Sequence, residues 1–80
     1  MDDQDIIRHI SELAGEERQL EEAHAGEGLT DTERDRLHSL EETLDRLWDL
    51  LRQRRALRSA GRSPDEALER PADTVEHYLQ

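Results

Sequence analysis

The chain has no cysteine and no phenylalanine, and Trp48 and Tyr78 are its only aromatic residues. Without cysteine it can form no disulfide, offer no thiol nucleophile and build no thiolate metal site. No apolar run approaches the roughly 18–20 residues that span a bilayer. Residues 1–5 are acidic where a signal peptide is basic, so we expect a cytoplasmic protein that has no membrane contact.

Catalytic signatures are also missing. All eleven basic residues are arginine, so the lysine of a nucleotide-binding P-loop is absent, and so is a glycine-rich phosphate loop. The order of residues matches no Ser/His/Asp nucleophile arrangement. A few helices of this polarity rarely enclose a pocket. We therefore expect a protein that is not an enzyme and that binds no cofactor.

The short length limits the core that the chain can bury. Eighty residues make one small domain, 1–80, and the large apolar side chains are few. A monomer of this composition is marginal. In the absence of disulfides and metals the usual remedy is oligomerisation, so we expect a homodimer.

Charge is distributed unevenly along the chain. The net charge is −10, with −9 in residues 1–33, +3 in 34–62 and −4 in 63–80. This balance argues against nucleic acid as the main partner. Five arginines nevertheless follow one another without an acid between them: Arg52, Arg54, Arg55, Arg58 and Arg62. We expect them first to neutralise acids of this chain or of a dimer mate. The alternatives are an acidic protein partner, and a nucleic acid or anionic lipid.

The first helix is expected at about residues 3–24. Asp2 or Asp3 can cap it, because acids are favoured at a helix N-terminus. A heptad-like apolar seam follows at Ile6, Ile10, Leu13 and Leu20, with Glu17 and His24 at the positions between and after them. Gly26 and Gly28 then break the pattern, and Gly26 is suited to a left-handed helix stop.

The second helix is expected at about residues 31–60. Thr30 and Glu33 have the spacing of a capping box, with Leu29 as the preceding apolar residue. Leucines then recur at strict 3-4 spacing, at Leu37, Leu40, Leu44, Leu47 and Leu51. No helix breaker occurs before Gly61.

A short connection makes the two helices antiparallel neighbours. Aligning their seams places Leu13 against Leu44 and Ile10 against Leu47. In every such pair the two residue numbers sum to 57. The same register places Asp3 beside Arg54 and Asp5 beside Arg52.

The apolar surface of the second helix is wider than one partner helix can cover. Leu50 and Leu57 lie on one flank of the seam and Trp48 lies on the other. We expect residues 63–80 to cover one flank, because Ser63 and Pro64 form a helix start and Val75, Tyr78 and Leu79 are apolar. A second protomer is expected to cover the other, with Trp48, Leu50, Leu57 and Glu17 as the interface candidates.

Histidine and carboxylate spacing suggests a further alternative. Glu21-x-x-His24 has the spacing of carboxylate-bridged metal sites, and Asp35-x-x-His38 imitates it. The two pairs do not face each other in the expected register, so we expect no metal site, and a His/carboxylate metal-binding bundle is the second alternative. Glu17 lies on the apolar seam, where it can pair with an arginine across an interface or extend toward Arg36 or solvent.

Four stretches of the sequence are distinctive: LDRLWDLLRQRRA at 44–56, Met1-Asp2-Asp3 with Ile6, Gly26-x-Gly28-Leu29, and Arg70-Pro71-x-x-x-Val75-Glu76-x-Tyr78-Leu79-Gln80. Together they resemble a small actinobacterial family classed as a domain of unknown function. The likeness covers nearly the whole chain. It implies that the C-terminal residues belong to the domain, and it implies no activity.

These observations predict an all-α protein. The predicted fold is an antiparallel two-helix hairpin with a short docked C-terminal helical segment, dimerising into a helical bundle. We expect a non-enzymatic interaction or structural module. The alternative is a regulator that uses the arginine-rich residues 52–62 to bind an acidic protein or nucleic acid.

Overall fold

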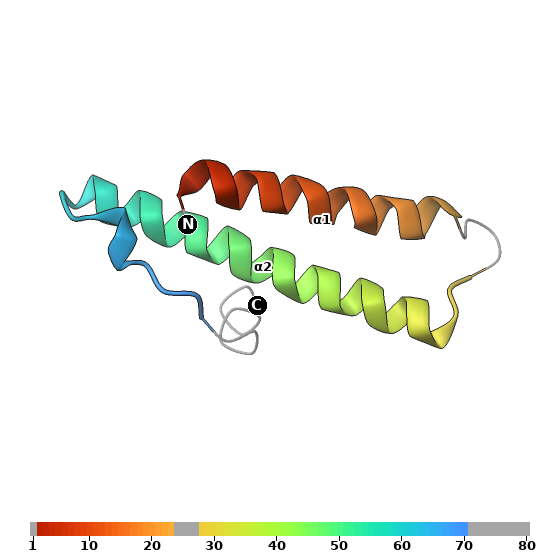
Figure 1. The fold of residues 1–80 in the computed structure, drawn as a ribbon. Helices are drawn as coiled ribbons and strands as arrows, with labels where there is room; N and C mark the ends of the chain where they lie inside the picture. Colours follow the sequence, from red (N-terminus) through yellow and green to blue (C-terminus); the bar gives the residue numbers. More distant parts are fainter. Residues whose placement is uncertain (1, 24–27, 71–80) are drawn as a thin grey trace.

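The computed structural model describes residues 2–23 and 28–70 and contains two long helices lying side by side (Figure 1). Helix α1 spans Asp3–Ala23, helix α2 spans Asp31–Ser59, and a 3-10 turn, η1, spans Pro64–Glu66. No strand occurs in these residues. The predicted all-α hairpin is confirmed.

Both helices begin with reciprocal side-chain caps. At α1 the Asp5 backbone N–H donates to Asp2 Oδ1 at 2.9 Å, and the Asp2 N–H donates to Asp5 Oδ2 at 3.3 Å. At α2 the Glu33 N–H donates to Thr30 Oγ1 at 3.2 Å, and the Thr30 N–H donates to Glu33 Oε1 at 3.0 Å. The capping box predicted at Thr30 is confirmed.

Helix α2 ends at a glycine in the left-handed region. Gly61 has φ 74°, where other residues are strained. Its N–H donates to the Arg58 carbonyl at 3.0 Å, and the Arg62 N–H donates to the Leu57 carbonyl at 2.8 Å. This pair of bonds is a Schellman motif, which reverses the chain direction. The other expected stop, Gly26, lies outside the described residues.

The first part of the seam on α1 and the last part of the seam on α2 form the core, while the predicted seam residues Leu20 and Leu37 are half-buried outside the core cluster. Five buried residues make one cluster, with Leu13 and Leu50 packed against it: Ile6, Ile10, Leu44, Leu47 and Leu51. Leu40 is also buried, at 1% exposure. The apolar spacing in the sequence therefore identified the face along which α1 and α2 pack.

A polar contact at the end of the seam fixes the register. Arg54 Nε lies 2.6 Å from Asp3 Oδ1, as expected from residue numbers that sum to 57. The parallel expectation for Asp5 and Arg52 is wrong. Asp5 caps α1 and pairs with Arg8 at 3.2 Å, while Arg52 is exposed.

Residues 63–70, called here the returning segment, run back along α2 after the turn at Gly61 (Figure 1). The Ser63 hydroxyl accepts a hydrogen bond from the Asp65 N–H at 3.2 Å, as a helix cap does. The 3-10 turn stops at once, because Ala67 is extended, with φ −65° and ψ 139°. The predicted docking is confirmed for this part. The expected packing of Val75, Tyr78 and Leu79 lies outside the described residues.

Candidate functional site

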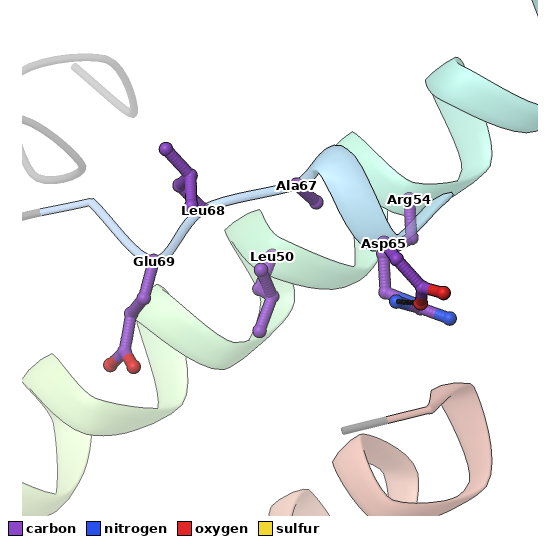
Figure 2. A pocket seen from close by; sticks show the side chains of 6 residues that line it. All are labelled: Leu50, Arg54, Asp65, Ala67, Leu68 and Glu69. Atoms are coloured by element: carbon purple, nitrogen blue, oxygen red, sulfur yellow. Dashed lines mark hydrogen bonds and ion pairs between the residues drawn. The ribbon is translucent and has the colours of Figure 1, made fainter. Parts of the chain in front are cut away.

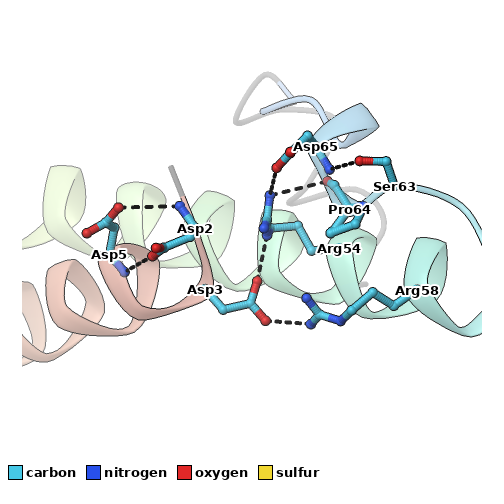
Figure 3. A network of polar contacts seen from close by, with 8 residues as sticks. All are labelled: Asp2, Asp3, Asp5, Arg54, Arg58, Ser63, Pro64 and Asp65. Atoms are coloured by element: carbon cyan, nitrogen blue, oxygen red, sulfur yellow. Dashed lines mark hydrogen bonds and ion pairs between the residues drawn. The ribbon is translucent and has the colours of Figure 1, made fainter.

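An arginine occupies the seam position that follows Leu51, and its side chain is only 8% exposed. Besides its contact with Asp3, Arg54 Nη1 lies 3.1 Å from Asp65 Oδ1 and donates to the Pro64 carbonyl at 3.3 Å (Figure 3). Arg54 thereby joins the start of α1, the end of α2 and the returning segment. Arg54 therefore binds other parts of its own chain.

Arg58 completes this group, because its Nη2 lies 2.5 Å from Asp3 Oδ2. The hydrogen bonds from Arg58 and Arg54 lower the pKa of Asp3 from its ordinary value of 3.8 to about 2, against the opposing effect of burial. Hydrogen bonds to Asp3 and then Asp65 raise the pKa of Arg54. We call Asp3, Arg54, Arg58, Pro64 and Asp65 the Arg54 cluster.

The Arg54 cluster predicts a pH-dependent stability. Because folding depresses the pKa of Asp3 from 3.8 to about 2, its ionised form stabilises the fold above pH 3.8, and this contribution is lost as the pH falls toward 2. Asp3→Asn should therefore melt at a lower temperature than the unmodified protein at about pH 7, and the gap should close near pH 2. Thermal melts by circular dichroism measure this. The exposed Glu12→Gln should show no such gap, and a gap for Asp3→Asn that persists at pH 2 would contradict the assignment.

A second polar group holds the middle of the returning segment to α2. Asp49 is a charged residue on the outer side of α2, yet its side chain is only 3% exposed. Arg70 covers it with two hydrogen bonds, from Nε to Oδ2 at 2.9 Å and from Nη2 to Oδ1 at 2.6 Å. Gln53 Nε2 also donates to Asp49 Oδ2 at 2.9 Å. The carboxylate is thus paired and hydrogen-bonded, as a buried charge requires.

Gln53 binds the backbone of the returning segment as well. Its Nε2 donates to the Leu68 carbonyl at 2.7 Å, and its Oε1 accepts from the Leu68 N–H at 3.4 Å. We call Asp49, Gln53, Leu68 and Arg70 the Asp49 cluster. This cluster was not predicted from the sequence. Its one signal was Asp49 and Gln53 at i, i+4 spacing within the distinctive WDLLRQRR run.

A groove lies between α2 and the returning segment (Figure 2). Its volume is about 280 Å³, and it is lined by Leu50, Arg54, Asp65, Ala67, Leu68 and Glu69. The two charged residues at one end, Arg54 and Asp65, already bind each other. The groove therefore brings together no unpaired acid and base that could act on a substrate.

The apolar side chains on the two flanks of α2 differ in how far they are buried. Leu50 packs against the core and Leu57 is half-buried, both beside the returning segment. Trp48, on the other flank, is 44% exposed, and Ile7 of α1 is 41% exposed. Each follows a buried seam residue by one position. In an antiparallel pair such residues lie on the same side of the hairpin, so Ile7 and Trp48 share one apolar face.

The five clustered arginines have different surroundings. Arg54 and Arg58 belong to the Arg54 cluster, and Arg62 makes a bidentate pair with Glu66 at 2.7 and 3.1 Å. Arg52 and Arg55 are exposed and have no ion pair within residues 2–23 and 28–70. Of the five clustered arginines, Arg52 and Arg55 are therefore the two whose side chains the described residues leave available to a partner.

Glu17 is half-buried, and the register in which residue numbers sum to 57 sets it opposite Leu40. Burial raises its pKa, and the neighbouring carboxylates of Glu21, Glu41 and Asp45 raise it further. Arg36 does not reach Glu17, because it binds Glu16 through two hydrogen bonds of 2.9 Å. One end of the Trp48 flank thus has an excess of negative charge.

The described part of the chain contains no group of three His, Asp or Glu side chains that could hold a metal ion. His38 instead lies 2.8 Å from Glu42 along α2, and His24 lies outside the described residues. The same residues include no helix long and apolar enough to cross a membrane.

The fold and its clusters define a small helical-hairpin protein in which the returning segment, residues 63–70, is held to α2 by arginine–carboxylate contacts. The chain belongs to the family described as "Protein of unknown function (DUF2630)", whose model matches residues 2–80. It is 46% identical over 77 residues to uncharacterized proteins of Mycobacterium bovis and of two strains of Mycobacterium tuberculosis, covering 95% of this chain and 88% of each relative. No solved structure matches.

Proposed function

We propose that this protein is a non-enzymatic, cytoplasmic interaction module that works as a homo-oligomer. The observation that carries the proposal is the exposed Trp48, beside Ile7, on the flank of the hairpin that the returning segment does not cover. A large aromatic with a polar N–H is the type of residue that is enriched at the centres of protein interfaces.

The composition of the core supports the same proposal. The buried apolar residues form one short row between two helices, and an isolated hairpin of this size is marginal. Burying the exposed parts of Trp48 and Ile7 against a second chain would add apolar contact to this small core. Association would then contribute to stability as well as to function.

A second candidate function rests on Arg52 and Arg55. Both arginines are exposed and without an ion pair in the described residues, so they could bind an acidic protein or a nucleic acid. Phosphate contacts would make such binding fall steeply with salt. The net charge of −10 weighs against a polyanion. A second copy of this chain carries the same net charge of −10, so only local pairing of opposite charges could favour it over another acidic partner.

The test is the state of association of the full chain. In sedimentation velocity at micromolar concentration we expect a dimer. Trp48→Ala should raise the dissociation constant of this dimer by about thirtyfold or more, as for residues at interface centres. Leu68→Ala removes a 74% exposed side chain on the other flank and should leave the dimer unchanged.

Helix content of each variant is measured by circular dichroism, so that dissociation is separated from unfolding. A folded, monodisperse monomer of the unmodified protein at micromolar concentration would contradict the proposal. It would leave the arginines as the candidate contact.

A further inference from the structure

Charge is ordered around Trp48 along its face of α2. Glu41 lies seven residues before Trp48 and Arg55 seven residues after it, while Asp45 and Arg52 lie three before and four after. At about 100° per residue all four lie within about 60° of Trp48 around the helix. We call these five residues the Trp48 face. Its N-terminal half is acidic and its C-terminal half is basic.

Such an order is self-complementary. A two-fold axis through Trp48 would run α2 antiparallel to α2 of another copy and place residues whose numbers sum to about 96 opposite each other. Glu41 would then face Arg55 of the second copy, and Asp45 would face Arg52 of the second copy. Two-fold symmetry forms each pair twice, so four ion pairs would surround two stacked or adjacent tryptophans.

We propose that the occupant of the Trp48 face is a second copy of this chain, docked with its α2 antiparallel, with Glu41 bound to Arg55 and Asp45 bound to Arg52 across the two-fold axis. This inference rests on the proposed homo-oligomeric function and specifies its geometry. The product is a four-helix bundle with α2 of each protomer at the centre.

The four charged side chains of the Trp48 face are not paired within the described part of the chain, so they are available to bind a second copy. In residues 2–23 and 28–70 none of the four makes an ion pair or a side-chain hydrogen bond, whereas seven other arginines do. The acids also act on Glu17, whose pKa is raised by burial and then by the carboxylates of Glu21, Glu41 and Asp45. Arginines from a second copy would compensate this negative charge.

The shape of the hairpin permits the approach. Most of the returning segment runs along the flank of Leu50, and its last residue, Arg70, crosses the outer side of α2 to Asp49, where it lines a hollow with Arg52. On the other side α1 adds the apolar Ile7 beside Trp48, and both side chains are exposed. From Glu41 to Arg55 the face is about 21 Å long, at about 1.5 Å per residue. It therefore offers an apolar centre with a charged rim, the usual order of a protein interface.

The test exchanges charges between copies. Glu41→Arg alone would set arginine against Arg55 twice, and Arg55→Glu alone would set glutamate against Glu41 twice. Each single variant should self-associate at least about tenfold more weakly than the unmodified chain. An equimolar mixture of the two variants should form a heterodimer, because both kinds of pair then have opposite charges. Sedimentation with one variant fluorescently labelled measures this, and about 1 M salt should weaken the preference.

Two control variants separate local pairing from net charge. Glu12→Arg and Arg18→Glu change the net charge by the same amounts at exposed positions outside the Trp48 face, and their mixture should show no preference for the heterodimer. A dimer that both single reversals leave intact, or a mixture without heterodimer preference, would overturn this geometry and leave the proposed homo-oligomer standing. A monomeric unmodified chain, with residues 71–80 or another protein as the occupant, would overturn both.

Discussion

Leu51→Ala is expected to lower the free energy of unfolding by about 2–5 kcal/mol, the range for removing a buried leucine side chain from a core. Leu51 is 1% exposed and packs in the cluster that contains Ile6, which is 0% exposed. A domain of this length has a total stability of about 4–12 kcal/mol, at about 0.05–0.15 kcal/mol per residue. The loss is therefore a large share of the total, and the variant should unfold at a clearly lower urea concentration than the unmodified protein.

Leu68→Ala is the matched control, because it deletes the same atoms from a side chain that is 74% exposed. It should change the free energy of unfolding by no more than about 0.5 kcal/mol. Urea titrations followed by circular dichroism at one fixed protein concentration compare the two, since association also contributes to apparent stability. Equal losses for both variants would mean that the seam is not the core.

The seam was predictable from sequence because a helix repeats its buried face at a fixed interval. The spacing of Leu44, Leu47 and Leu51 could be satisfied only by a partner helix with a matching row, and Ile6 and Ile10 supplied it. The short connection then fixed the direction of the second helix. The register followed from aligning the rows, and the Asp3–Arg54 contact of 2.6 Å agrees with it.

The expectation for Asp5 and Arg52 failed for a local reason. Sequence alignment of two rows treats every side chain as available to the neighbouring helix, but a residue in the first turn of a helix is also close to unpaired backbone N–H groups. Asp5 is within reach of the Asp2 N–H and of Arg8 on its own helix. These contacts at i−3 and i+3 replaced the contact across the hairpin.

The docking of the returning segment could be expected, but the residues that hold it could not. Periodicity assigns every polar residue opposite the seam to solvent, so Asp49 and Gln53 read as an ordinary outer surface. Their role depends on the path of residues 67–70, which form neither helix nor strand and have no repeating pattern. The Schellman turn at Gly61 sets the direction of this segment. The point at which the segment contacts α2 depends on the tertiary structure and cannot be predicted from the sequence pattern.

Removing the pairing of Asp49 and Arg70 is expected to have the second largest effect on stability. Asp49→Ala leaves the guanidinium of Arg70 without this carboxylate, and Arg70→Ala leaves a carboxylate that is 3% exposed with Gln53 as its remaining partner in the Asp49 cluster. A buried charge that loses its partner costs about 3–5 kcal/mol. Because the Arg70 side chain is 40% exposed, solvent should reduce the loss for each single variant to about 1–3 kcal/mol.

A double-mutant cycle isolates the contact from everything else that Arg70 does. If the two hydrogen bonds of 2.6 and 2.9 Å hold the returning segment in place, the double variant should lose clearly less stability than the two single losses combined, with a coupling of about 1 kcal/mol or more. The exposed pair of Arg62 and Glu66, with side chains 63% and 45% exposed, provides the control. Its coupling should stay at about 0.5 kcal/mol or below, as for helix-type pairs in water. Equal couplings for the two pairs would mean that burial of Asp49 does not strengthen its contact, and that another feature holds the returning segment against α2.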